Sequence, residues 1–157
     1  MTKNLDIKIR RANPSEAAVL SNIAIRAKRS NGYSDSFMDA CRDELTVTAK
    51  DVSVGEYWIA ETKVIQGFVC LLVSPEQQNG EIHSFFVDPV WQRQGVGILL
   101  WKKVMERAKS MNICSIFLNS DPSAVPFYSE LGFRVICDVP SGSIAGRMIP
   151  RMELDIS

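Results

Sequence analysis

The chain has 157 residues, of which 46% are hydrophobic, and it contains only 9 glycines and 7 prolines. This length and composition predict a single domain over residues 1–157 with one sizeable core. Lysine and arginine balance aspartate and glutamate at 18 each, so no net charge favours nucleic acid or an anionic membrane as a partner. The start shows no signal peptide, and no apolar run approaches the roughly 20 residues of a membrane span, which predicts a cytoplasmic protein.

The first third of the chain predicts one strand and two helices. Residues 6–12 (DIKIRRA) alternate apolar and polar side chains, as a half-buried strand does. Asn13 as the N-cap and Pro14 in the first turn then predict a helix over residues 13–30. After the turn NGYSDS, Ser36 is placed to cap a short helix that ends near residue 45.

The rest of the chain is predicted to supply six more strands. Three strand-like runs separated by short polar segments favour an antiparallel meander, at residues 56–61, 64–73 and 81–87. A helix over about 95–110 is followed by a strand, a short helix and two last strands, at residues 115–120, 123–132, 133–139 and 148–156. The order βααβββαβαββ is an α+β layout with a mixed sheet. The Gly/Ser-rich residues 140–147 form the loop between the last two strands in this interpretation.

The four cysteines are Cys41, Cys70, Cys114 and Cys137, and they lie far apart without a C-x-x-C pair. Because the chain has a single histidine to complete a metal site, no metal centre is expected. We interpret the cysteines as buried thiols in a reducing compartment.

A glycine-containing segment, Gln92–Gly97 (QRQGVG), connects a predicted strand to a predicted helix. Successive backbone N–H groups at the positive end of a helix bind phosphate, and glycines let the backbone approach the anion. Gln92, Arg93 and Gln94 add side-chain donors, although the segment is neither a Walker A loop nor a G-x-G-x-x-G fingerprint. The same glycines also suit an ordinary strand-to-helix connection, so the segment alone supports both interpretations.

Two motifs in order resemble those of the GCN5-related N-acetyltransferase (GNAT) superfamily. Residues 81–100 (EIHSFFVDPVWQRQGVGILL) are similar to its acetyl-CoA signature, whose Q/R-x-x-G-x-G/A core falls on Gln92–Gly97. Residues 124–133 (AVPFYSELGF) resemble the segment that carries the catalytic tyrosine of the family, which falls on Tyr128. The resemblance implies a largely antiparallel seven-stranded sheet flanked by about four helices. Asp121 departs from the pattern, because many members have asparagine there, and its role stays open.

The resemblance also implies acetyl-CoA as the co-substrate and a set of residues that hold it. The pantetheine arm is expected to pair with the backbone of Phe85, Phe86 and Val87 by strand addition. A β-bulge is expected near the same three residues, where it would aim an N–H at the thioester oxygen. The pyrophosphate is expected on the amides of Arg93, Gln94, Gly95, Val96 and Gly97. Asn119, at the end of the next strand, is expected to contact the cofactor or the incoming amine.

Acyl transfer to an amine requires a base, because a lysine-like ammonium has a pKa of about 10.4 and is protonated at neutral pH. Glu81 and His83 are expected on the same face of their strand by the period-two rule. Glu81 is the favoured base, because it lies 14 positions before Gly95, a spacing similar to that in the histone acetyltransferase branch. His83, which titrates near neutrality when unperturbed, is the second candidate. Both also suit an ordinary structural role in a strand.

The Tyr128 hydroxyl is the candidate donor to the departing coenzyme A thiolate. Alternatively, Tyr128 is only an aromatic residue of the core. These residues predict direct attack by a primary amine of a small molecule or peptide in a ternary complex, without a covalent enzyme intermediate. A non-catalytic acyl-CoA-binding sensor or interaction module is the alternative. The family architecture implies that residues 30–40 and the loop 140–147 border the acceptor. Tyr33, Asp35 and Asp39 are candidates to receive a cationic substrate, although an exposed polar turn would have the same composition. The sequence does not determine the acceptor, the preferred acyl chain or whether the chain forms a homodimer.

Overall fold

The computed structural model describes residues 6–157, so the first five residues of the start segment lie outside the described part. Seven strands form one mixed sheet in the order β1-β2-β3-β4-β5-β7-β6. Each neighbouring pair is antiparallel except β4 and β5, which confirms the predicted α+β fold with a largely antiparallel sheet. The strands are β1 (Lys8–Arg11), β2 (Glu56–Glu61), β3 (Ile65–Ser74), β4 (Asn79–Val87), β5 (Ser115–Asn119), β6 (Arg134–Pro140) and β7 (Met148–Asp155).

The helices number five in residues 6–157, one more than predicted: α1 (Ala17–Arg29), α2 (Asp35–Leu45), α3 (Ala49–Val54), α4 (Val96–Ser110) and α5 (Val125–Glu130). The missed helix is α3, and its N-terminus is held by a reciprocal cap. The Thr48 hydroxyl accepts a hydrogen bond from the Asp51 N–H at 3.0 Å, and the Asp51 carboxylate accepts one from the Thr48 N–H at 2.9 Å. The predicted order therefore lacks one helix before β2.

The predicted cap of α2 is also wrong by two residues. Ser34, and not Ser36, precedes the first turn, and its hydroxyl oxygen accepts a hydrogen bond from the Phe37 N–H at 3.2 Å. Both serines stand before the apolar helical face, so composition does not distinguish them. The backbone does, because the cap must be extended while the next residues are already helical.

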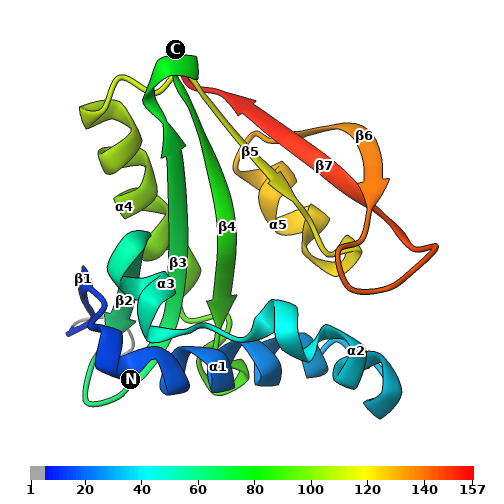
Figure 1. The fold of residues 1–157 in the computed structure, drawn as a ribbon. Helices are drawn as coiled ribbons and strands as arrows, with labels where there is room; N and C mark the ends of the chain where they lie inside the picture. The colour runs from blue at the N-terminus through cyan, green and yellow to red at the C-terminus, as the bar shows by residue number, and fades with distance from the viewer. Residues whose placement is uncertain (1–5) are drawn as a thin grey trace.

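The core lies on both faces of the sheet, and β3 shows why. Alternate residues of a strand point to opposite faces. Phe68 and Cys70 pack with α1, α2 and α3, whereas Val69 and Leu71 pack with α4 on the other face. All four are at most 1% exposed, and burial of each large apolar side chain contributes roughly 1.5–3 kcal/mol. In Figure 1, α4 lies alongside this central strand, and α1 and α2 run across one end of the sheet.

The sheet opens between β4 and β5, and this opening positions the site. The two strands pair at only three positions, from Asn79–Ser115 to Glu81–Phe117, whereas the pairing of β4 with β3 continues to Val87. Figure 1 shows the two strands together at one end and diverging toward the end where α1 and α2 lie. Beyond Glu81, the edge of β4 that faces β5 therefore borders a widening gap.

A β-bulge accompanies the opening, close to the predicted place. The β3–β4 register shifts where Cys70 pairs with Ser84 and Leu71 with Ile82, so His83 is the extra residue. A bulge bends its strand and increases the local twist, which fits the divergence of β4 from β5 directly after this point. The bulge expected near residues 85–87 is thus found at His83.

Burial corrects the interpretation of the cysteines. Cys41 and Cys70 are buried as expected, but Cys114 is half-buried and Cys137 is exposed, and all four are free thiols. Burial raises the pKa of the Cys70 thiol to about 12, so this thiol stays protonated.

None of the helices described in residues 6–157 has the length and apolar character needed to span a membrane.

Candidate active site

A cleft of about 770 Å³ occupies the opening between β4 and β5. Its walls come from β4, from the first turn of α4, from α1 and α2, and from the segments that follow β5 and β6. The cleft brings together most of the predicted site residues, namely Glu81, His83, Phe85, Phe86, Val87, Gln92, Arg93, Val96, Gly97, Asn119 and Tyr128. Gln94 and Gly95 are not among the residues that line it.

The glycine segment forms the turn into α4. Gly95 is the N-cap of this helix with a φ of 86°, and Arg93 also has a left-handed φ of 64°. Glycine adopts such angles without strain, so Gly95 is required by the turn itself. Gly97 lies in the wall of the cleft, where an added Cβ would be 3.4 Å from the Phe127 ring. The two glycines therefore serve different purposes, one conformational and one that keeps the wall free of a side chain.

Val96 and Gly97, in the first turn of α4, line the cleft. The four N-terminal N–H groups of a helix have no acceptor within the helix, and they lie at the positive end of its dipole. The Arg93 side chain lines the same region. This end of the cleft is therefore suited to an anion such as a phosphate.

The candidate bases lie together on β4. The Glu81 carboxylate oxygen Oε2 is 3.7 Å from His83 Nδ1, and both residues line the cleft. This separation is longer than a hydrogen bond, so the two groups are neighbours without a direct bond. Their side chains are 31% and 51% exposed, which leaves both accessible to water and to a substrate.

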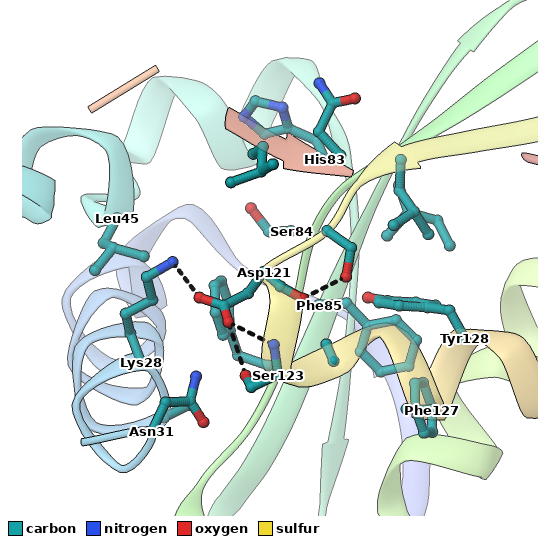
Figure 2. A pocket seen from close by; sticks show the side chains of 18 of the residues that line it. Lys28, Asn31, Leu45, His83, Ser84, Phe85, Asp121, Ser123, Phe127 and Tyr128 are labelled. Atoms are coloured by element: carbon teal, nitrogen blue, oxygen red, sulfur yellow. Dashed lines mark hydrogen bonds and ion pairs between the residues drawn. The ribbon is translucent and has the colours of Figure 1, made fainter. Parts of the chain in front are cut away.

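Tyr128 projects from α5 with its ring packed edge-on against Phe85, Phe127 and Phe133 at centroid distances of 5.2–6.2 Å. The residue is 7% exposed, and Figure 2 shows its hydroxyl directed toward the middle of the pocket. No hydrogen-bond partner for this hydroxyl occurs in the described chain. Burial raises the pKa of Tyr128 above its usual value, so the hydroxyl is a proton-carrying donor at neutral pH.

Asp121, whose role the sequence left open, is the centre of a polar network in the cleft wall. Its carboxylate accepts hydrogen bonds from Lys28 Nζ at 2.7 Å, from the Tyr33 hydroxyl at 2.9 Å and from the Ser123 N–H at 2.9 Å. Figure 2 shows the contacts with Lys28 and Ser123. Burial alone would raise the pKa of Asp121, but the hydrogen bonds from Lys28 and Ser123 outweigh burial and lower it to about 2.

Because this pKa is depressed in the folded state, ionised Asp121 stabilises the protein above the unfolded pKa of about 4, and the contribution disappears as the pH falls toward 2. We expect Asp121→Asn to lower the free energy of unfolding by about 2 kcal/mol at pH 7, with a smaller difference at pH 3. Urea unfolding at both pH values measures this. Asp35→Asn is the matched control, because the Asp35 side chain is 91% exposed. An Asp121 difference that does not change with pH would contradict the network.

The residues proposed to border the acceptor are only partly in place. Asp35 pairs with Arg29 at 2.7 Å and Asp39 with Arg42 at 3.3 Å, and neither lines the cleft. The loop 140–147 does border it, through Ser141, Gly142, Ser143 and Arg147. The prediction for the two aspartates was thus wrong, because their helical positions point their side chains to solvent.

Two charged residues of the cleft, Lys28 and Glu44, lie outside the segments that the sequence placed beside the acceptor, whereas Asn31 and Arg147 lie within them. Glu44 of α2 accepts a hydrogen bond from the Ser143 hydroxyl at 2.5 Å, across 99 positions of sequence. Only their convergence in space marks these residues, and no local motif surrounds them. Among residues 6–157, no group of three or more His, Cys, Asp or Glu side chains is arranged to hold a metal ion.

Comparison with known proteins identifies the family. The sequence model of the acetyltransferase (GNAT) domain matches residues 55–155, so the chain belongs to the GNAT acetyltransferase family, as its motifs predicted. A glucosamine 6-phosphate N-acetyltransferase from Trypanosoma brucei brucei is 31% identical over 75 residues. That alignment covers 45% of this chain, and the chain spans about half (51%) of the relative's length.

Solved structures show the same fold. A GCN5-related N-acetyltransferase from Rhodopseudomonas palustris superposes with a TM-score of 0.81 at 20% identity, with 99% of each chain covered. The PaiA N-acetyltransferase from Thermoplasma acidophilum, in complex with coenzyme A, has a TM-score of 0.78 at 17% identity, with 96% of this chain and 99% of that one covered. The ribosomal-protein-S18-alanine N-acetyltransferase from Escherichia coli has a TM-score of 0.69 at 18% identity, with 96% of this chain and 94% of that one covered.

Proposed function

We propose that this chain is an acetyl-CoA-dependent N-acetyltransferase, built as a single domain over residues 1–157. It transfers the acetyl group to a primary amine of a small molecule or peptide by direct attack in a ternary complex. The observation that carries the proposal is that the edge of β4 beyond its pairing with β5, the first turn of α4 and the Tyr128 hydroxyl all meet in one cleft.

Each part of the cofactor has a complementary surface in the cleft. The β4 backbone at Phe85, Phe86 and Val87 offers donors and acceptors to the amides of the pantetheine arm, as an added strand would. The N–H groups at the start of α4, with Arg93, suit the pyrophosphate. The coenzyme A in the Thermoplasma acidophilum structure and the acetyl-CoA in a putative acetyltransferase of Salmonella typhimurium support this assignment.

The proposed catalytic steps use Glu81 of β4 and Tyr128 of α5, which both line the cleft. Glu81, directly or through water or His83, takes the proton that the ammonium group must lose before its nitrogen can attack. The nitrogen then forms a bond to the thioester carbon and the carbon–sulfur bond breaks, while the second proton that the nitrogen loses passes to water or, by way of Tyr128, to the departing sulfur, so that the products are a neutral amide and a free thiol. The Tyr128 hydroxyl donates a hydrogen bond or its proton to the departing thiolate, and its raised pKa keeps that proton available at neutral pH.

The deciding experiment is acetyl transfer by the purified protein. We expect acetyl-CoA and a panel of amines to release free thiol, with a matching acetylated product by mass spectrometry. The relatives suggest the first acceptors: glucosamine 6-phosphate, its parent glucosamine and a peptide that begins with alanine. Coenzyme A binding without acetylation across a broad panel would instead support the non-catalytic sensor.

Binding of the cofactor should be visible without turnover. A ligand that binds only the native state adds about 2.7 kcal/mol of stability at 100 times its dissociation constant. For a chain of this size the melting temperature should rise by roughly 5–10 °C. Differential scanning fluorimetry with coenzyme A measures the shift, with adenosine as the control ligand. An unchanged melting temperature at saturating coenzyme A would remove the cofactor assignment.

Gly95→Val should weaken coenzyme A binding about tenfold or more, because a β-branched residue in the left-handed region is strained by at least 1–2 kcal/mol and displaces the first turn of α4. Gly95→Asn is the matched control, since asparagine tolerates a positive φ. Its dissociation constant should stay within about threefold of wild type. Calorimetric titration of variants with native circular dichroism decides between them. Equal affinity in Gly95→Val would mean that the turn does not position the binding amides.

A further inference from the structure

Two cationic side chains, those of Lys28 and Arg147, line the acceptor side of the cleft and lie against a pair of stacked aromatic rings. Tyr33 and Phe37 stack with their ring centroids 4.0 Å apart. Lys28 Nζ lies 5.4 Å from the Tyr33 centroid, and the Arg147 guanidinium lies 4.9 Å from the Phe37 centroid. Both cationic residues line the cleft, and their side chains are only 13% and 20% exposed. We call Lys28, Arg147, Tyr33, Phe37 and Asp121 the cationic cluster.

The cationic cluster carries one more positive charge than negative charge. Asp121 is the carboxylate in contact with both cations, at 2.7 Å from Lys28 and 3.9 Å from Arg147. The other carboxylates of the cleft, Glu44 and Glu81, lie against Ser143 and His83. A half-buried net charge is costly when it is unpaired, and an anionic ligand group would offset it.

The cations also keep hydrogen-bond donors available. A lysine ammonium has three N–H donors and an arginine guanidinium has five. Within residues 6–157, the side chains of Lys28 and Arg147 donate one hydrogen bond each, to Asp121 and to the Tyr33 hydroxyl. The remaining donors border the cleft, with the Asn31 amide beside Lys28 in Figure 2.

The same contacts argue against a cationic acceptor group at this place. The aromatic faces of Tyr33 and Phe37 and the Asp121 carboxylate are the groups that would attract such a cation. They are already engaged by Lys28 and Arg147. What the cationic cluster presents to a ligand is therefore positive charge and N–H donors.

We infer that the acceptor amine carries an anionic group, a phosphate or a carboxylate, which Lys28 and Arg147 bind while Asp121 and Tyr33 hold the two cations in position. This inference rests on the proposed acetyl transfer. The anionic group binds at the cationic cluster, and the amine of the same molecule extends toward Glu81 on β4, which lines the same cleft. The substrate class is thus a small amine with both a positive and a negative end.

Matched acceptor pairs test the inference. Glucosamine 6-phosphate against glucosamine removes only a phosphate, and alanine against alaninamide removes only a carboxylate charge. Because a charge-assisted hydrogen bond contributes a factor of about ten or more, the anionic member of one pair should have an at least tenfold higher kcat/KM, mostly through KM. The pair that shows the preference distinguishes phosphate from carboxylate. Arg147→Gln and Lys28→Met should each reduce the preference about tenfold.

Arg134→Gln is the control, because Arg134 is an exposed arginine of β6 outside the cleft, and its preference should equal that of wild type. Acetylation of neutral amines as fast as of their anionic partners would overturn the inference while leaving acetyl transfer intact. An anion preference that remains unchanged in both Arg147→Gln and Lys28→Met would also overturn the inference.

If no amine in either pair is acetylated, binding of inorganic phosphate tests the inference instead. Its binding to the protein–coenzyme A complex, followed by calorimetry, should weaken about tenfold in Arg147→Gln. Absence of phosphate binding, or binding that Arg147→Gln leaves unchanged, would overturn the inference. Coenzyme A binding in the same titrations reports separately on the proposed function.

Discussion

Tyr128→Phe should lower the single-turnover rate of acetyl transfer by roughly 100-fold or more, the range typical of lost general-acid assistance. The substitution removes one hydroxyl and keeps the ring that packs against Phe85, Phe127 and Phe133, so the fold and the coenzyme A affinity should change little. The loss should fall on kcat and not on KM, because the contact with sulfur strengthens in the transition state.

Rapid-quench measurement of a single turnover is needed for Tyr128→Phe, because slow product release would hide a chemical defect in kcat. Tyr57→Phe is the matched control. Tyr57 is 4% exposed and belongs to the core on the opposite face of the sheet from Tyr128, so loss of its hydroxyl should leave the transfer rate unchanged. An unaltered single-turnover rate in Tyr128→Phe would make Tyr128 a packing residue.

Glu81→Gln should lower the rate at pH 7 by about 100-fold and move the rate profile to higher pH, because the free amine must then come from solution. Glutamine keeps the size and polarity of the side chain but cannot take a proton. The measurement is kcat/KM from pH 6 to pH 10, with Glu76→Gln, an exposed residue of the β3–β4 connection, as the control.

His83→Ala decides which member of the Glu81–His83 pair is the base. If Glu81 accepts the proton directly, His83→Ala should retain most of the rate and the shape of the pH profile. A Glu81→Gln profile identical to wild type, together with a His83→Ala profile that loses its neutral limb, would show that the roles are reversed.

The elements that the sequence predicted well are those whose pattern is local. The strand at residues 56–61 was placed with its observed bounds, because Tyr57 and Ile59 alternate with residues of the other face. The turn into α4 was also found, since Gly95 and Gly97 have few alternatives before an apolar helical repeat. Such signals depend only on neighbours in the chain.

The α3 helix has only a weak local signal in the sequence. Thr48 and Asp51 have the spacing of a capping box, but the helix they begin has only 6 residues and its periodicity covers less than two turns. The bulge at His83 had no such signal. Its position depends on the pairing of β4 with β3, which is a contact between separate strands.

The polar network of the cleft could not be predicted for the same physical reason. Asp121 reaches Lys28 across 93 positions and Tyr33 across 88. The side chains that complete such a cluster are ordinary surface residue types in sequence, and only the tertiary fold removes them from water. Asp121 departs from the family pattern, yet nothing in its sequence neighbourhood indicates Lys28 or Tyr33 as its partners.

The short pairing of β4 with β5 has a consequence for hydrogen exchange. In a strand that pairs on one side only, successive amides point alternately to a partner and to the open side. The amides of β4 after the bulge should therefore exchange in a period-two pattern in the free protein, slow toward β3 and fast toward the cleft. A bound pantetheine arm would protect the fast set and join β5, β6 and β7 more firmly to the rest of the sheet. The local stability of that half of the molecule would then follow the supply of its own co-substrate.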